Sequence, residues 1–328
     1  MRYILVTGGA GYIGSYICKL FHENGFIPVT FDNLLLGNKW AVKWGPLETG
    51  DLCNKKDLHN LFNKYVFDGV IHLAGFSNVS ESVKNPSLYY NNNVIGSFNL
   101  LEKMIEFNVK RIVFSSTAAV YGNPIASLID ESHPTHPINP YGDSKLSVER
   151  LIYNYSLSYG ISFISLRYFN VSGSDFLSQI GEAHSPETHI IPLALEAAYQ
   201  NSIFKINGND YNTNDGTCIR DFIHLKDLGD AHLRSFQKLS TSKIREFINV
   251  GGGKGLSVNE VIECVKKITN VNFKTIIFKR RNGDPASLVS NINKSKKILS
   301  WSPQNSSIEK IISDSWDWYK YYKSFNLT

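Results

Sequence analysis

The feature that most constrains the fold of this chain is a glycine-rich turn near its N-terminus. Residues 7–14 read TGGAGYIG, with an apolar run before them and an amphipathic run after them. Glycines spaced by three, here Gly8, Gly11 and Gly14, allow a tight turn, a close approach of the backbone to a pyrophosphate and close packing of a helix on a sheet. The N-terminus of the following helix offers N–H groups and a partial positive charge to phosphate. The turn therefore predicts a strand, a dinucleotide-binding loop and a helix.

The first half of the chain repeats this alternation of short apolar runs with longer amphipathic ones. The runs typical of buried strands lie at Tyr3–Thr7, Ile27–Phe31, Val70–Leu73, Arg111–Ser115 and Ser162–Arg167. The stretches with helical periodicity lie at Tyr12–His22, Lys55–Lys64, Ser87–Phe107 and Ser144–Tyr159. Continuously apolar strands that alternate with helices predict an α/β fold with a doubly wound parallel Rossmann sheet.

The pattern loosens after about residue 173 of the 328 residues. Loops rich in Gly, Asn and Pro, such as Gly208–Gly216 and Asn282–Pro285, become frequent. We therefore expect a nucleotide-binding domain over residues 1–173 and, over 174–328, mainly a smaller substrate lobe. The apolar segment Phe247–Val250 predicts one further strand that returns to the sheet.

Composition and charge exclude several classes of function. The formal charge is +5, but Lys and Arg are spread along the chain, so no nucleic-acid partner is predicted. The mild positive charge fits a small anionic substrate. The four cysteines lie in neither a CxxC pair nor a metal-ligand spacing, which predicts no metal centre and a reducing, cytoplasmic location. Neither a signal peptide nor an apolar run of the roughly 18 residues that span a bilayer is recognisable, so no membrane association is expected.

Acidic residues after the second and third strands indicate which dinucleotide is bound. Asp32 ends the second strand, 18 residues after Gly14, where a carboxylate can accept both ribose hydroxyl protons of the adenosine half. Because it would repel a 2′-phosphate, we expect NAD rather than NADP. Asp51 is placed to meet the adenine amino group. The cofactor contacts expected from these segments are Gly8, Gly11, Tyr12, Ile13, Gly14, Asp32, Asn33, Asp51, Leu52, Ala74 and Gly75.

A tyrosine and a lysine four residues apart, Tyr141 and Lys145, form a candidate catalytic pair. If a helix begins near Tyr141, both side chains lie on one face. A phenol titrates near 10, but a nearby ammonium and a cationic nicotinamide ring favour the phenolate. The pair could also arise by chance in a chain with 17 tyrosines. The string SSTAAVYG at 115–122 strengthens it, because a hydroxyl there could steer a proton to Tyr141.

Taken together, these motifs resemble those of the extended short-chain dehydrogenases/reductases, specifically the UDP-galactose 4-epimerases. Nearly the whole chain shares the likeness. Further matching segments are YYNNNV at 89–94, RYFN at 167–170, DGTCIRDFIH at 215–224 and RRNGD at 280–284. The resemblance implies NAD-dependent inversion of carbon 4 of a UDP-sugar through a 4-keto intermediate, with UDP-glucose and UDP-galactose as the expected pair. It also implies a homodimer formed by the helices around Ser87–Phe107 and Ser144–Tyr159.

The resemblance also assigns roles to individual residues. The catalytic group would be Thr117, Tyr141 and Lys145. The additional residues around the cofactor would be Asn92, Ser115 and Tyr168. The residues that hold the UDP-sugar would be Asn170, His189, Arg220, Arg281, Asp284 and Leu288. Arginine suits phosphate, because its planar guanidinium can form two parallel hydrogen bonds.

Alternatives within the same fold stay open. A dehydratase or decarboxylase would need an acidic residue where this chain has Ala118 and Ala119. A non-catalytic NAD-binding regulator would be expected to lack Tyr141 or Lys145. UDP-N-acetylglucosamine and UDP-pentoses remain possible substrates, and Leu288 bears on them. A large Tyr at that position in the family is associated with rejection of N-acetyl sugars.

Overall fold

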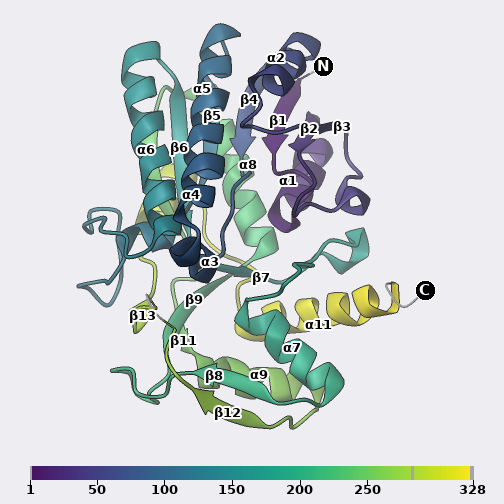
Figure 1. Cartoon of the computed structure of the whole chain (residues 1–328), viewed down its shortest axis with the longest axis vertical. Coiled ribbons are helices and arrows are strands. Elements are labelled where there is room, and N and C mark those ends of the chain that lie inside the picture. Colours follow the sequence, from purple (N-terminus) through teal and green to yellow (C-terminus); the bar gives the residue numbers. More distant parts are fainter. Residues whose placement is uncertain (1, 282–283, 326–328) are drawn as a thin grey trace.

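The computed structural model of the chain describes residues 2–281 and 284–325, so Asn282 and Gly283 of the predicted loop lie outside the described residues. Its centre is a seven-stranded sheet with the order β10-β6-β5-β4-β1-β2-β3, in which every pair is parallel (Figure 1). The strands are β1 (Tyr3–Thr7), β2 (Ile27–Asp32), β3 (Leu47–Thr49), β4 (Phe67–His72), β5 (Arg111–Thr117), β6 (Ser162–Tyr168) and β10 (Arg245–Val250). The doubly wound sheet and the returning strand near residue 247 are confirmed.

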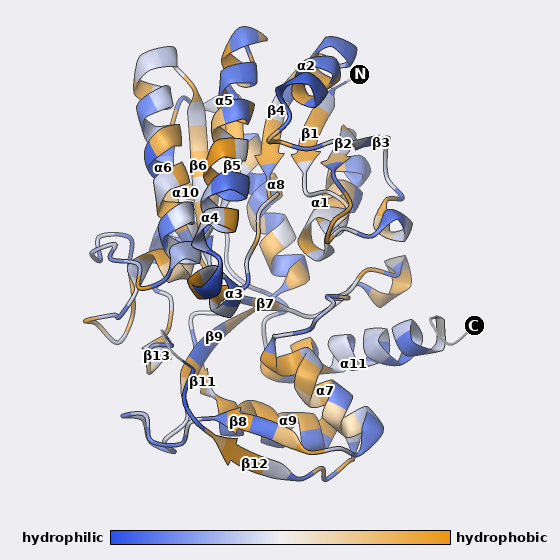
Figure 2. Ribbon diagram, viewed as in Figure 1, coloured by the Kyte–Doolittle hydropathy of each residue, from blue (hydrophilic) through white to orange (hydrophobic). Residues whose placement is uncertain are grey.

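Helices cover both faces of this sheet. One core contains residues of α1 (Tyr12–Glu23), α8 (Leu225–Thr241) and α10 (Asn293–Leu299). The other contains residues of α2 (Lys55–Lys64), α5 (Gly96–Glu106) and α6 (Pro140–Tyr159). Along β1, Ile4 and Val6 belong to the first core and Leu5 to the second. Because successive side chains of a strand point to opposite faces, a strand covered on both faces must be apolar throughout, as the colouring of Figure 2 shows.

The predicted helix Ser87–Phe107 is present in the structure, with a π-helical turn inside it. It consists of α4 (Pro86–Tyr89), a π-helical turn η2 (Tyr90–Ile95) and α5. Within η2, Asn93 is buried and reaches a distant loop: its Oδ1 accepts from the Phe76 N–H at 2.8 Å, and its Nδ2 donates to the Ser144 hydroxyl at 3.0 Å. The widened turn therefore serves a tertiary contact that hydrophobic periodicity does not record.

Helix α6 begins four residues before the predicted start at Ser144. Asn139 caps it, because its side-chain oxygen accepts from the Gly142 N–H at 2.9 Å, and Pro140 occupies the first helical position. Tyr141 consequently lies in the first turn, one turn before Lys145. This start places both residues on the helix, as the candidate pair requires.

The second lobe is more regular than its loop-rich sequence suggests. Strand β9 (Ile219–His224) pairs with β7 (Asn170–Ser172), β11 (Gly255–Ser257) and β13 (Ser287–Leu288), and β8 (Phe204–Asn207) pairs with β12 (Thr275–Phe278). A separate apolar core holds α7 (Ile190–Gln200), α9 (Val258–Thr269) and α11 (Ile308–Phe325) against β8. The remaining short helices are η1 (Lys39–Ala41), α3 (Val79–Lys84), η3 (Ala118–Tyr121) and η4 (Phe176–Ser178). Within residues 2–281 and 284–325, no helix is both long and apolar enough to cross a bilayer.

Candidate active site

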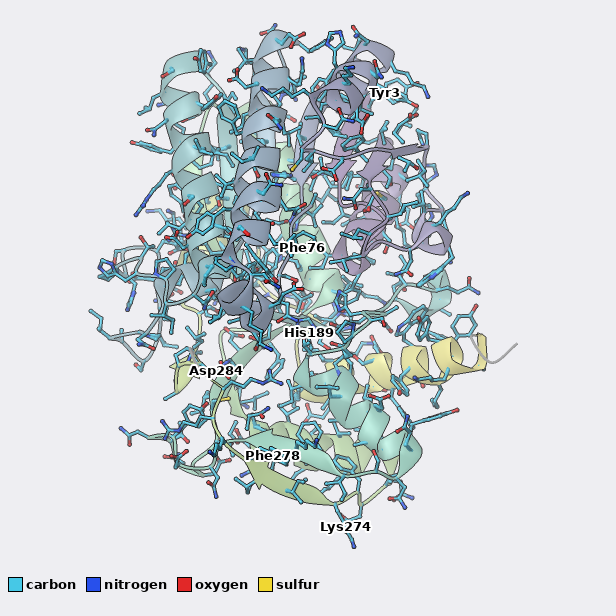
Figure 3. The ribbon with its side chains drawn as sticks, viewed as in Figure 1. Tyr3, Phe76, His189, Lys274, Phe278 and Asp284 are labelled. Carbon is cyan, nitrogen blue, oxygen red and sulfur yellow. The ribbon has the colours of Figure 1, made fainter. Side chains whose placement is uncertain are left out.

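A cavity of about 460 Å³ lies between the carboxyl ends of the sheet strands and the second lobe. Phe76, His189 and Asp284, labelled in Figure 3, come from different parts of the chain and all line it. The predicted site residues that line this one cavity are Gly8, Gly11, Tyr12, Ile13, Gly14, Asp32, Asn33, Asp51, Leu52, Ala74, Gly75, Asn92, Thr117, Tyr141, Lys145, Tyr168, Asn170, His189, Arg220, Asp284 and Leu288.

The glycine-rich turn has the geometry of a pyrophosphate cradle. Gly8 adopts a φ of +72°, and a Cβ there would lie 2.8 Å from the Ala74 nitrogen. A Cβ on Gly14 would lie 2.1 Å from the Gly8 oxygen, so only glycine lets α1 pack this closely on the turn. Gly11 is the N-cap of α1 and has no side chain to occupy the first N–H groups of the helix. These groups stay available to phosphate oxygens, so the turn fits a dinucleotide.

Two carboxylates organise the adenosine end of the cavity. Asp32 is 9% exposed; its Oδ2 accepts from the Ala10 N–H at 3.1 Å and its Oδ1 from the Leu34 N–H at 2.9 Å. Burial raises the pKa of Asp32, and these two hydrogen bonds oppose the rise. Asn33 donates to the Asp51 carboxylate at 2.9 Å and so links the ends of β2 and β3. The carboxylates are thus fixed before any ligand arrives.

The candidate catalytic residues meet where α6 and β5 approach each other. The Lys145 ammonium donates to the Ser115 carbonyl at 3.0 Å, and burial lowers the pKa of Lys145 to about 8. Burial raises the pKa of Tyr141, while a hydrogen bond with the Thr117 hydroxyl lowers it. The net shift of the Tyr141 pKa is upward, so the side chains alone do not produce the phenolate expected from the sequence. A positive charge close to the phenol would lower its pKa.

Ser115 and Arg281 stand apart from the other predicted site residues. Ser115 is fully buried, with its hydroxyl 3.1 Å from the His232 Nε2, and it is not among the described residues that line the cavity. Its contribution is the backbone carbonyl that holds Lys145. Arg281 is exposed and likewise absent from the described lining. It immediately precedes Asn282.

The substrate end of the cavity is built around an ion pair. Arg220 is 8% exposed and contacts the Asp284 carboxylate at 2.5 Å; a second guanidinium nitrogen donates to the Ile219 carbonyl at 2.8 Å. Among the described residues, these are its two hydrogen-bond partners, and a guanidinium has five N–H donors in all. Leu288 lines the cavity and also packs against the buried cluster that contains Ala118 and Phe169.

Sequence reasoning missed a polar loop on the cavity wall. His189 was expected to contact UDP, but its Nδ1 lies 2.6 Å from Glu182 and 3.1 Å from Glu187. Burial lowers the pKa of His189, but these two carboxylates outweigh burial and raise the pKa to about 10. The same competition raises the pKa of His184 to about 9. The spacing E-x-H-x-x-E-x-H at 182–189 was the available signal.

Comparisons with known proteins agree about the family. Residues 4–251 match the model of the "NAD dependent epimerase/dehydratase family". A UDP-glucose 4-epimerase from Halalkalibacterium halodurans is 45% identical over 97% of this chain and 95% of its own. The crystal structure of a UDP-glucose 4-epimerase from Brucella ovis in complex with NAD has a TM-score of 0.94 and 38% identity, covering 97% and 98% of the two chains. One from Bifidobacterium longum in complex with NAD+ and UDP has a TM-score of 0.93 and 31% identity, covering 98% and 99%.

Proposed function

Because the chain belongs to the NAD dependent epimerase/dehydratase family, we propose that it is an isomerase that inverts carbon 4 of a UDP-sugar and interconverts UDP-glucose and UDP-galactose. The observation that carries this proposal is the single cavity lined by the glycine-rich turn, by Thr117, Tyr141 and Lys145, and by the Arg220–Asp284 pair. This shared lining supports a site in which a nucleotide cofactor, an acid–base pair and an anion-binding group act on one sugar nucleotide.

The cofactor is NAD. The turn from Gly8 to Gly14 would hold its pyrophosphate against the N-terminus of α1, and Asp32 would accept the ribose hydroxyls and disfavour a 2′-phosphate. When bound, NAD supplies a reversible hydride acceptor for carbon 4, so that the sugar passes through a 4-ketone. Asn33, Asp51 and Leu52 would surround the adenine, and Ala74, Gly75, Asn92 and Tyr168 the rest of the cofactor.

The chemistry on the protein side is a proton transfer. Tyr141 takes the proton of the sugar 4-hydroxyl, and the Thr117 hydroxyl holds the reacting oxygen in line with the phenol. The Ser115 carbonyl holds the Lys145 ammonium, and Lys145 lines the same cavity as Tyr141. After the sugar presents its opposite face, Tyr141 returns the proton to the ketone oxygen as carbon 4 is reduced. The oxygen keeps its position on carbon 4, and only the configuration changes.

The mechanism requires tight binding of the UDP moiety and weak binding of the sugar, so that the sugar can rotate between the two hydride transfers. We assign the binding of UDP to Arg220, Asp284, Asn170, His189 and Arg281, with Leu288 beside the sugar. Arg220 carries the assignment, because it is buried on the cavity wall and its planar guanidinium suits a diphosphate. Asp284 holds its guanidinium in place.

Incubation of purified protein with a panel of UDP-sugars, followed by NMR of the products, tests the function. We expect UDP-glucose and UDP-galactose to interconvert without added cofactor, and denatured protein to release NAD in about equal amount. The same panel measures UDP-N-acetylglucosamine and UDP-pentoses, which remain alternative substrates. A dehydrated or decarboxylated product, a requirement for NADP, or bound NAD without any turnover would overturn the proposal.

Exposed apolar side chains on neighbouring helices support a homodimer. These side chains include Leu88, Tyr90 and Ile95 on α4 and η2, and Tyr153 and Leu157 on α6, each between 38% and 54% exposed. Burying such a surface against a second copy is favourable. Sedimentation analysis should report a dimer for the wild type and a monomer for Leu157→Glu; a monomeric wild type would contradict this. We further propose a cytoplasmic location, supported by four cysteines that are all free thiols.

A further inference from the structure

Four side chains of the cavity-wall loop form a cluster, and only one of them, His189, has a part in the proposed mechanism, as a contact to UDP. Glu182, His184, Glu187 and His189 each offer one ligand atom, and these atoms all lie within 4.8 Å of one another. The Nδ1 of His189 lies 2.6 Å from Glu182 and 3.1 Å from Glu187, and the Nδ1 of His184 lies 3.1 Å from Glu182 and 3.8 Å from Glu187. Both imidazole rings thus turn the same nitrogen toward the same two carboxylates.

These separations suit a tetrahedral cation site. Zinc binds imidazole nitrogen and carboxylate oxygen at about 2.0–2.2 Å, so four such ligand atoms stand roughly 3.3 Å apart. The four histidine–glutamate contacts lie on both sides of that distance, with His189 facing Oε1 of Glu187 and His184 facing its Oε2. Two imidazoles and two carboxylates are also donors that zinc and similar divalent transition metals accept, whereas calcium and magnesium prefer oxygen alone.

The same carboxylate also has a buried oxygen that lacks a partner. The Glu182 side chain is only 7% exposed. Its Oε1 faces both histidines, whereas its Oε2 is buried and finds no hydrogen-bond partner in the part of the chain that the structure describes. A buried carboxylate normally has every oxygen compensated, either by donors or by a metal. A cation held by both oxygens of the Glu182 carboxylate would supply that compensation.

We propose that Glu182, His184, Glu187 and His189 bind one divalent transition-metal ion, with zinc as the best match to the donor set. The two carboxylates carry the charge that balances a divalent cation, so binding leaves no uncompensated charge beside the largely buried Glu182 side chain.

With four protein ligands the site is closed, so the role of the ion is structural. The Trp318 indole donates to the Glu182 carbonyl at 2.8 Å, and His184 packs edge-on against Tyr12 with ring centroids 6.5 Å apart. The ion would therefore join α11 to the wall of the cofactor cavity. Coordination through Nδ1 places the proton of His189 on Nε2, and this N–H would be the donor to a UDP phosphate, a detail that rests on the proposed function.

Metal content tests the site without using activity. Protein is treated with a chelator, dialysed, reconstituted with zinc sulfate, desalted and analysed by mass spectrometry for zinc. We expect about one ion per chain in the wild type. His184→Ala should lower the zinc affinity at least about tenfold, and the isosteric Glu187→Gln should lower it as well. Zinc should also raise the Tm of the wild type by several degrees but not that of the two variants.

The matched control is His59→Ala. His59 also lies beside a glutamate, 3.3 Å from Glu106, but belongs to a surface pair without further ligands, so its loss should leave the zinc content unchanged. Circular dichroism and retained NAD show whether each variant is folded. A reconstituted wild type with less than about a tenth of an ion per chain, or His184→Ala with wild-type zinc, would overturn the site. Either result would leave the epimerase proposal intact.

Discussion

The two ends of the cavity are built by different means. At the cofactor end the cradle is backbone, and its shape depends on side chains that are missing at Gly8 and Gly14. At the substrate end the contacts are side chains, such as Arg220 and Asp284, from segments far apart in the chain. The first kind of site is set by local sequence. The second exists only once the lobe has folded. The nucleotide end should therefore tolerate no added atoms, whereas the sugar end should respond to changes in donor geometry and volume.

The largest effect is expected where the two ends meet. Tyr141→Phe removes the phenolic proton carrier but keeps the ring, so kcat should fall by about 10²–10⁴-fold while the KM for UDP-galactose changes little. Steady-state kinetics measures both. Near-normal turnover in this variant would remove Tyr141 from the mechanism and leave the two ends without their proposed chemical link.

Gly14→Ala tests the backbone-built end. The added Cβ would lie 2.1 Å from the Gly8 oxygen, so we expect a loss of about 1–3 kcal/mol in folding stability and protein that no longer retains NAD. Gly25→Ala is the control, because its Cβ would meet nothing within 4 Å although its φ is +80°. The control should lose some stability but keep its NAD. Equal NAD contents in the two variants would contradict the cradle.

Arg220→Lys tests the end built from side chains. Lysine keeps the charge but loses the planar fork, so KM for UDP-galactose should rise roughly 10–100-fold through the loss of charge-assisted hydrogen bonds, with bound NAD unchanged. Arg280→Lys, which alters an exposed pair with Asp210, should change KM by less than about twofold. If the two substitutions behave alike, Arg220 does not hold the diphosphate.

The smallest effect is expected at Leu288, which shapes volume rather than charge. Leucine leaves more room than a tyrosine ring but offers an acetamido group no hydrogen bond. The wild type should therefore prefer UDP-galactose over UDP-N-acetylgalactosamine by about 10–200-fold. Leu288→Tyr should abolish the N-acetyl activity and spare the galactose activity. Values of kcat/KM for both sugars decide this, and an unchanged ratio would show that Leu288 does not gate the pocket.

The sequence predicts the elements that depend on local signals better than those that depend on contacts between distant segments. Strand β1 has the predicted bounds, and α1 ends one residue after its predicted end, because their apolar runs and glycines are local signals. The π-helical turn at Asn93 was not predicted, because hydrophobic periodicity does not record the contacts of Asn93 with Phe76 and Ser144. Likewise β8 and β12 pair across a long stretch of chain, and their short runs carry no local sign of a partner.

The late return of the chain to the central sheet limits how far the protein can fold during its synthesis. Strand β10 covers the β6 edge, and Leu228 and Phe236 of α8 are fully buried in the core under β1. A ribosome that has released only the first 173 residues therefore exposes an apolar sheet face and an unpaired strand edge. Such surfaces are prone to aggregation until their partners arrive. Completion of the nucleotide-binding fold has to wait for a segment synthesised after much of the second lobe, so a fragment that ends at residue 173 should be insoluble.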